Sequence, residues 1–274
     1  MASGGFTVGE AELIDLSYLP THEITCNDRH NRYWRKGERI VRRWGLVVAA
    51  GESHRMAHLG SKLWLNIAGH PVLRWSLAHF IGGAEWDGGV IVCRADDKVR
   101  VVDLLLNLGY RNWGVTDGGA WRHASVQNGL GWLADHGMHK QDAVLVHDAA
   151  RLLVDGELIG RVLDGVARYG AAIPVVPIVD TVKRIREGST FLEITEDRAR
   201  LALAQTPQGF LSDVIANAYQ DWTLGIPTDD AQVVEQYGHQ VAWVVGDVDN
   251  RKLTTPEDVA WFEWKVRKRY PGMG

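Results

Sequence analysis

Short apolar runs alternate with longer amphipathic stretches from Gly45 onward. The runs are rich in valine and isoleucine and too short for helices, which predicts buried strands at 45–51, 88–93, 113–119, 142–150 and 171–178. The stretches between them predict helices at 71–81, 96–110, 123–137 and 155–170. Strands and helices in regular alternation indicate an α/β fold with a mostly parallel sheet that helices cover on both faces.

This alternation breaks at Asp180. Two extended segments surround "EGST" in 180–210, and no complete helix separates them. An extended excursion of this length needs a surface to pack against, so we expect a β-arm at about 179–204 that packs on a partner subunit. Helices at 211–222, 228–238 and 255–270 and a strand at 240–247 complete the predicted domain.

Residues 1–44 have little hydrophobic periodicity and contain the polar stretch "THEITCNDRHNRYWRKGERIVRR". We expect them to form an N-terminal extension that either packs on the body or is partly disordered. Residues 45–274 then form the main domain.

Composition and charge narrow the classes of partner. The chain has 30 basic and 34 acidic residues, a net charge of −4, which argues against a nucleic-acid-binding protein. No apolar run approaches the roughly 18 residues of a membrane span, and the N-terminus lacks a secretory signal. Two cysteines are too few for a disulfide framework. We therefore expect a cytoplasmic protein with no nucleic-acid or membrane partner.

The end of the first strand combines small residues with cations. Ala49, Ala50 and Gly51 let a ligand approach the backbone closely, and Arg55 and Lys62 follow on the same loop. This combination suits a polyphosphate. The sequence lacks the glycine fingerprint of dinucleotide sites and the lysine of a P-loop. An ordinary turn with two surface cations is the alternative.

Later strand ends add a flat-ligand site and a carboxylate. At the end of strand 113–119, Gly119 admits a flat ligand, and Ser125 on the following turn could bond a base edge or cap a helix. At the end of strand 142–150, Asp148 is a candidate Mg²⁺ ligand next to Arg151; the alternative is that Asp148 caps a helix. His147 is better explained as a packed core residue.

The last predicted strand, 240–247, brings a second acid and a further cation. Asp249 is a second candidate metal ligand. Lys252 could reach bound phosphates; the alternative interpretation is that its side chain is simply solvated. Ligands of open α/β sheets bind at the carboxyl edge of the strands, so these groups are expected to converge there.

Several motifs occur in a fixed order: "AAG", "GG" before "SV", "VLVHDAAR", "AAIPVVP" before "DTVKR", "AQTPQGF", "TDDA" and "TTPED". With them, residues 45–268 resemble the 2-C-methyl-D-erythritol 4-phosphate cytidylyltransferase family. The resemblance implies a Rossmann-like nucleotidyltransferase domain, a homodimer formed through the arm, Mg²⁺ as cofactor, and transfer of CMP from CTP to a sugar-alcohol phosphate in non-mevalonate isoprenoid biosynthesis.

The resemblance also implies roles for single residues. Arg55 and Lys62 would stabilise charge on the α-phosphate, and Lys252 would position the substrates. Asp148 would hold the metal. The arm would bring its acceptor-phosphate contacts, Thr181 and Arg198, to the neighbouring subunit's site. Residues that would hold CTP are Ala49, Ala50, Gly51, Gly119 and Ser125, and weaker matches to the acceptor pocket are Thr206 and Thr228.

The loop before the predicted lysine departs from the family pattern. Ser53 replaces a second glycine, Ser61 a proline, and Leu63 and Trp64 a Gln-Tyr pair. Two alternatives therefore stay open: a cytidylyltransferase for another acceptor such as ribitol 5-phosphate, and a weakened, non-catalytic paralogue.

Overall fold

The protein is built on one eight-stranded mixed sheet. The computed structural model describes residues 34–36, 39–51 and 61–271. In spatial order the sheet runs β12 (Ala202–Ala204), β9 (Ala171–Pro177), β13 (Gln208–Leu211), β8 (Ala143–Asp148), β3 (Arg43–Val48), β6 (Gly88–Cys93) and β7 (Trp113–Asp117), with β14 (Ala242–Val245) pairing with β9. The predicted α/β class with a mostly parallel sheet is confirmed.

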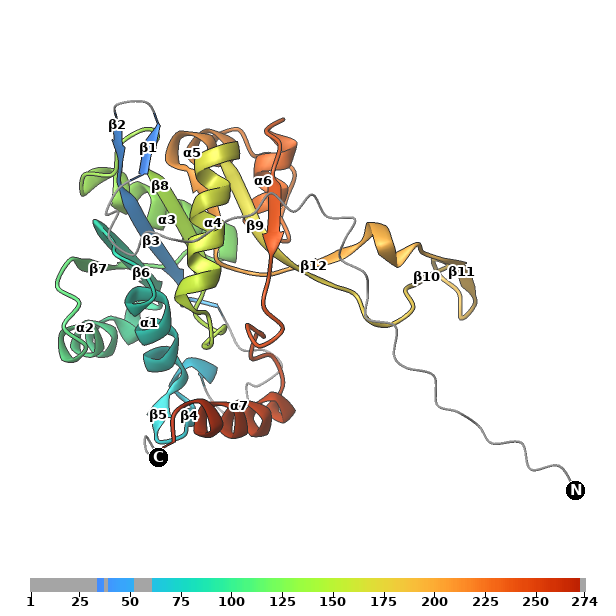
Figure 1. The fold of residues 1–274 in the computed structure, drawn as a ribbon, viewed down its shortest axis with the longest axis horizontal. Helices are drawn as coiled ribbons and strands as arrows, with labels where there is room; N and C mark the ends of the chain where they lie inside the picture. The colour runs from blue at the N-terminus through green and yellow to red at the C-terminus, as the bar shows by residue number, and fades with distance from the viewer. Residues whose placement is uncertain (1–33, 37–38, 52–60, 272–274) are drawn as a thin grey trace, which may run out of the picture. The chain divides into compact units, whose positions relative to one another are not determined.

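Helices cover both faces of the sheet (Figure 1). On one face lie α1 (Val72–Gly82), α2 (Lys98–Asn107) and α4 (Gly156–Tyr169), and α7 (Pro256–Arg269) adds to the same core beyond the end of the sheet, next to β4 (Asn66–Ile67). On the other face lie α3 (Arg122–Asp135), α5 (Ser212–Gln220) and α6 (Asp230–Gln236). Alternate residues of each strand serve the two cores. In β3, Val47 packs with the first group of helices while Leu46 and Val48 pack with the second.

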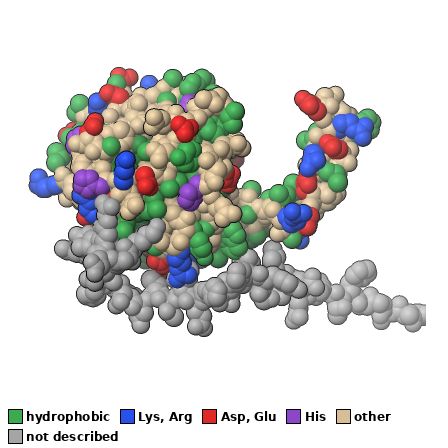
Figure 2. All heavy atoms as spheres, turned by 90° about the horizontal axis from the view of Figure 1, so that it is seen from above, with side chains coloured by type: hydrophobic (Ala, Val, Ile, Leu, Met, Phe, Trp, Pro, Cys, Tyr) green, Lys and Arg blue, Asp and Glu red, His purple; other side chains and the backbone are tan. Residues whose placement is uncertain are grey.

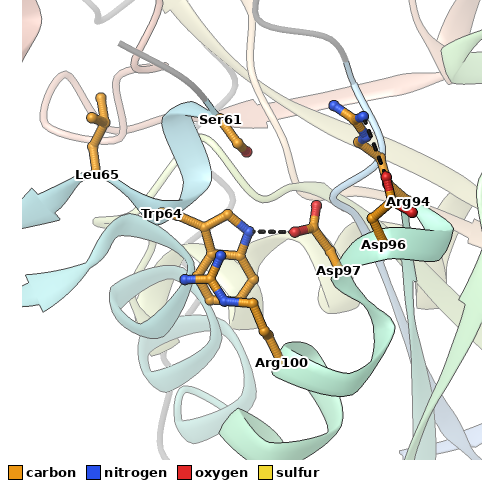
Figure 3. A pocket seen from close by; sticks show the side chains of 7 residues that line it. All are labelled: Ser61, Trp64, Leu65, Arg94, Asp96, Asp97 and Arg100. Carbon is orange, nitrogen blue, oxygen red and sulfur yellow. Dashed lines mark hydrogen bonds and ion pairs between the residues drawn. The ribbon is translucent and has the colours of Figure 1, made fainter.

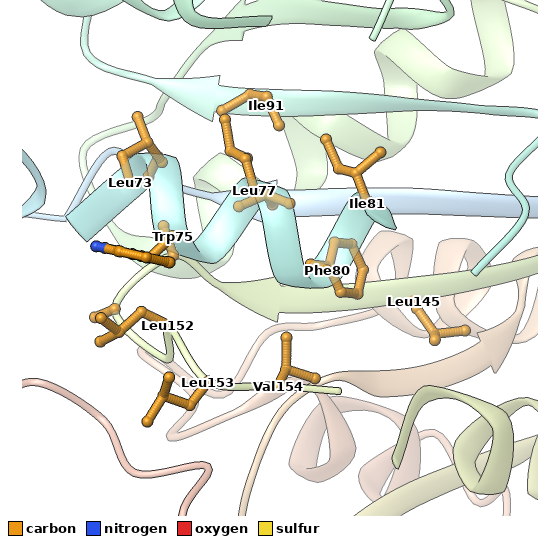
Figure 4. Packing of buried hydrophobic residues seen from close by; sticks show 14 of the residues in the cluster. Leu73, Trp75, Leu77, Phe80, Ile81, Ile91, Leu145, Leu152, Leu153 and Val154 are labelled. Carbon is orange, nitrogen blue, oxygen red and sulfur yellow. The ribbon is translucent and has the colours of Figure 1, made fainter. Parts of the chain in front are cut away.

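The core under α1 shows how tightly the layers are packed. Figure 4 shows Leu73, Leu77 and Phe80 of α1 pointing toward Ile91 and Leu145 of the sheet. Phe80 is fully buried. Such close packing fixes the strands, and with them the loops at their ends.

The parallel strands end at one edge. Val48 of β3 pairs with Asp148 of β8 and with Val92 of β6, and Cys93 pairs with Asp117 of β7. The loops that follow these strands therefore begin side by side, as predicted from the sequence.

One central strand was missed by the hydrophobic pattern. β13 runs antiparallel between β8 and β9, in a segment interpreted as part of the extended excursion. This strand consists of the four residues "QGFL", a stretch too short and too polar to be predicted as a core strand. Gly209 is required there because a Cβ would lie 2.7 Å from Val162 and Val166 of α4.

The predicted arm lies away from the sheet over residues 179–201 (Figure 1), whereas its last three residues form β12 and pair with β9. It carries the antiparallel hairpin β10 (Lys183–Ile185) and β11 (Leu192–Thr195), followed by η5 (Arg198–Arg200). Its apolar side chains are exposed, with Phe191 at 71%. Figure 2 shows hydrophobic and charged side chains interspersed along it. The two extended segments are confirmed, whereas pairing with a second subunit stays a prediction.

The remaining elements are short. They are the hairpins β1 (Trp34–Lys36) with β2 (Arg39–Val41) and β4 (Asn66–Ile67) with β5 (His70–Pro71), and the 3-10 turns η3 (Lys62–Trp64) and η4 (Ala95–Asp97). Part of the predicted extension 1–44 is thus strand, and β3 begins at Arg43; residues 1–33 lie outside the description. No helix within the described ranges is long and apolar enough to cross a membrane.

Candidate functional site

A cavity of about 460 Å³ opens at the carboxyl edge of the sheet. Its walls come from the ends of three neighbouring strands and from the start of α3. The residues that line it are Ala50, Gly51, Arg94, Gly118, Gly119, Ala120, Trp121, Arg122 and Ser125. Four of the five residues predicted to hold CTP, all except the buried Ala49, therefore face one cavity.

The glycine loop of this cavity is fixed by close contacts. A Cβ on Gly118 would lie 2.3 Å from the Cβ of Ala50, and one on Gly119 would lie 2.5 Å from the Cβ of Ala124. The Ser125 hydroxyl accepts a hydrogen bond from the Gly119 N–H at 3.0 Å and donates one to the Trp121 carbonyl at 3.1 Å. Ser125 thus holds the loop from within, and Trp121, not Ser125, is the N-cap residue of α3.

Asp148 lies at the centre of a charged network beside the cavity. Its carboxylate accepts hydrogen bonds from Lys252 Nζ at 2.6 Å and from Arg122 Nε at 3.1 Å. The solvated-lysine interpretation of Lys252 is therefore wrong. Although burial opposes ionisation, these cations hold the pKa of Asp148 well below its usual range. Asp148 is a carboxylate at all physiological pH values.

Buried groups behind Asp148 hold its backbone in place. The Asp148 N–H donates to Thr206 Oγ1 at 3.0 Å, and Thr206 lies 3.2 Å from Nδ1 of His147. His147 is fully buried and stacks on Phe80, and burial lowers its pKa to about 4. The interpretation of His147 as a packed core residue is confirmed. Thr206 lies behind the acidic site in this chain rather than on an open surface, because it is 4% exposed.

The segment that carries Lys62 is anchored through Trp64 of η3, which Figure 3 shows beside Asp97 and Arg100. Trp64 Nε1 donates to Asp97 Oδ1 at 2.7 Å, and the Arg100 guanidinium lies 3.7 Å from the centre of the indole ring. Lys62 Nζ itself lies 3.5 Å from the Leu253 carbonyl, next to Lys252 in sequence. The departure at Trp64 therefore supplies a clamp that joins the lysine segment to α2. Arg55 and Ser53 lie outside the described residues.

The other predicted site residues are not brought to this cavity in one chain. Asp249 forms an ion pair with Lys265 of α7. Thr181 and Arg198 are exposed on the arm, where Arg198 donates to the Val179 carbonyl. Thr228 bonds Gln232 of its own helix turn. Among the described residues, no group of three or more His, Cys, Asp or Glu could hold a metal ion.

A family model for 2-C-methyl-D-erythritol 4-phosphate cytidylyltransferase, IspD, matches residues 44–268. The chain belongs to the IspD family. Among curated IspD relatives, the bifunctional enzyme IspD/IspF of Bradyrhizobium diazoefficiens is 42% identical over 217 residues, which are 78% of this chain and 53% of the relative. That of Caulobacter vibrioides is 40% identical over 220 residues, 80% of this chain and 55% of the relative. The chain thus spans about half the length of the curated IspD/IspF relatives it matches.

Solved structures of IspD proteins agree with the fold. The 4-diphosphocytidyl-2C-methyl-D-erythritol synthase of Anaerococcus prevotii superposes with a TM-score of 0.71 at 27% identity, covering 83% of this chain and 99% of that one. The IspD protein of Thermus thermophilus superposes with a TM-score of 0.63 at 30% identity, covering 81% and 98%.

Two residues of this IspD site were not assigned roles from the sequence. Asp230, fully buried, accepts two hydrogen bonds from the Arg122 guanidinium at 2.9 and 2.8 Å. Gln208 accepts from the N–H groups of Asp230 and Ala231 and so fixes the start of α6. Both belong to motifs singled out above, "TDDA" and "AQTPQGF", but their partners lie far away in sequence. Only the folded chain shows that these motifs meet.

Proposed function

We propose that the chain transfers the cytidylyl group of CTP to 2-C-methyl-D-erythritol 4-phosphate. An oxygen of the acceptor phosphate bonds to the α-phosphorus of CTP, the bond from that phosphorus to the β-phosphate oxygen breaks, and pyrophosphate leaves. The observation that carries the proposal is the cavity at the sheet edge, whose wall residue Arg122 is bonded to Asp148, which also binds Lys252. Membership of the IspD family supports the choice of substrates.

Charge neutralisation is the main task of such a site. Both substrates are phosphate anions, so an in-line approach must overcome their mutual repulsion, and fixed cations reduce it. Lys62 and Arg55 are proposed to act on the α-phosphate, and Lys252 on the substrates from the opposite loop. Removing one charge-stabilising donor of this kind typically slows turnover about 100- to 1,000-fold.

The proposed reaction needs no general base. A phosphate monoester loses its second proton near pH 6, so its oxygens are already anionic at neutral pH. The buried imidazole of His147, which is neutral at that pH, therefore has no proton transfer to perform.

Mg²⁺ is proposed as the metal. This ion is usually held by one or two carboxylates together with substrate phosphates and water, so the single ionised carboxylate of Asp148 fits it. Asp148 would hold the ion through its carboxylate, which Lys252 contacts at 2.6 Å in this structure. Asp249 fits less well because Lys265 already neutralises it. When bound, Mg²⁺ would supply positive charge to the phosphates.

We further propose that the arm completes the acceptor site of a second copy of the chain. The support is that Thr181 and Arg198 lie on an arm that extends away from the sheet of their own chain (Figure 1). The exposed apolar side chains of the arm, among them Ile185, Phe191 and Ile194, offer a surface for pairing.

The deciding assay measures pyrophosphate release from CTP with 2-C-methyl-D-erythritol 4-phosphate, with and without Mg²⁺. Release that needs both the acceptor and the metal is expected. Faster pyrophosphate release with ribitol 5-phosphate would show that this compound is the acceptor instead. CTP binding without pyrophosphate release for any polyol phosphate would indicate a non-catalytic paralogue.

Subunit mixing tests the arm. In a dimer of a Lys62→Ala chain with an Arg198→Ala chain, one of the two sites regains both wild-type residues if the arm acts across subunits. Co-expression of the two variants, each nearly inactive alone, should therefore restore about one quarter of the wild-type activity, since half of the dimers are mixed. No restoration, or a monomer in sedimentation, would contradict the proposed role of the arm.

A cytoplasmic location is also proposed. The support is that the chain has two cysteines, too few for the disulfide framework typical of proteins in oxidising compartments. Fractionation of cells that produce the tagged chain would test this location.

A further inference from the structure

Trp121 occupies a position that neither the helix nor the core explains. It is the N-cap residue of α3, where Ser, Thr, Asp and Asn are strongly preferred because their side chains bond the free N–H groups. Within the described part of the chain, its side chain makes no capping hydrogen bond. The residue is 57% exposed, so it adds little to the core. A large apolar ring at an exposed cap breaks a local rule, which is expected where function intervenes.

The backbone that carries this ring is rigidly placed at the cavity. The Gly118 N–H donates to the Cys93 carbonyl at 2.8 Å, and the Ser125 N–H and hydroxyl donate to the Trp121 carbonyl at 3.0 and 3.1 Å. The same cavity is lined by Ala50 and by Gly118 and Gly119, and neither of these two glycines has room for a Cβ. The indole is thus attached to a fixed point of the backbone at the edge of this cavity.

A second planar group reaches the same cavity from β6. Arg94 follows Cys93 and lines both this cavity and the neighbouring one of about 300 Å³ that Figure 3 shows. It forms an ion pair with Asp96 at 3.9 Å, with side chains 51% and 90% exposed. An exposed pair at this distance holds the guanidinium only weakly, so it can turn toward a ligand.

We propose that Trp121 and Arg94 hold the nucleobase of CTP by stacking, with the indole and the guanidinium packing against the base in the cavity that Ala50, Gly118 and Gly119 also line. The inference rests on the proposed function, which places CTP in this cavity. Aromatic rings and guanidinium planes both stack on bases, and stacking hardly depends on which base is present. The contact therefore sets the affinity for the nucleotide, while other groups choose cytosine.

The decisive variant is Trp121→Ser, because serine is the better helix cap. It should leave the unfolding midpoint at or above that of wild type, yet raise the Kd for CTP, measured by calorimetry, about 5- to 100-fold. Trp121→Phe, which keeps an aromatic face, should have a Kd for CTP within about 3-fold of the wild-type value. Arg94→Gln should lose less affinity for CTP than Trp121→Ser does. Trp264→Ala, an equally exposed tryptophan on α7, is the matched control and should bind as wild type does.

Steady-state kinetics sharpen the test. Trp121→Ser should raise the KM for CTP without changing the KM for the acceptor, and should weaken UTP use by the same factor as CTP use. An unchanged Kd for CTP, or a loss as large in Trp121→Phe as in Trp121→Ser, would overturn the stacking contact. If the wild type binds CTP but transfers nothing, the proposed function fails, while the binding series still decides the role of Trp121.

Discussion

The Asp230→Asn substitution removes the charge of one buried partner of Arg122 and so tests how much this ion pair stabilises the fold. Asp230 is fully buried and binds the Arg122 guanidinium through both oxygens, at 2.9 and 2.8 Å. An amide cannot match this charge and offers one acceptor in place of two, so Arg122 keeps a buried cation whose remaining carboxylate partner is Asp148. Breaking one side of a buried ion pair costs about 3–5 kcal/mol. For a domain of this size the midpoint of thermal unfolding should then fall by roughly 6–20 °C.

Urea unfolding followed by far-UV circular dichroism would measure the cost. Tyr219→Phe, which removes a hydroxyl bonded to Asp230 but leaves the ion pair, is the control and should cost about 1–2 kcal/mol. In an Arg122→Met background, Asp230→Asn should cost clearly less than in wild type, because no buried cation is left behind. A loss below about 1 kcal/mol, or equal losses in the two backgrounds, would refute the reasoning.

Three further predictions concern the site and its support. Lys62→Ala should lower kcat at least about 100-fold in the pyrophosphate assay, and a near-normal rate would remove it from transition-state stabilisation. Trp64→Phe keeps the ring under Arg100 but loses the bond to Asp97; we expect kcat to fall about 10-fold with KM values unchanged, and a shift in KM alone would contradict a role in positioning Lys62. His147 has a pKa of about 4 in the fold and 6.5 when unfolded, so acid protonates the unfolded chain first and stability falls as the pH drops through this window. His147→Gln should remove up to about 1.4 kcal/mol per pH unit of that slope in urea titrations, and an unchanged slope would show that the imidazole does not titrate there.

The sequence predicted those parts of the fold that depend on local pattern. The strand 88–93 matches β6 because six apolar or small residues form a buried run, and the α4 prediction is correct because Asp155 and Gly170 cap its ends. β13 was missed because four residues carry too little pattern. Its place in the sheet is set by packing against α4 and β8, which are distant in sequence.

In the candidate site, too, some features could be predicted from the sequence and others could not. Convergence of the strand ends follows from a parallel sheet, so the positions of Asp148 and Gly119 at one edge could be foreseen. The pairing of Asp249 with Lys265 could not, because it depends on where α7 lies against the preceding loop. Side-chain partners across elements are decided by tertiary packing rather than by spacing along the chain.

A single backbone segment joins the two lysines proposed to act on the phosphates. Lys252 reaches Asp148, while the N–H of the next residue, Leu253, donates to the Ala150 carbonyl at 2.8 Å. The Leu253 carbonyl in turn lies 3.5 Å from Lys62 Nζ. Leu253 is fully buried, so its backbone cannot shift without disturbing the core. The segment carrying Lys62 and the loop carrying Lys252 therefore contact the same buried residue, which brings two cations from distant parts of the sequence to one side of the site.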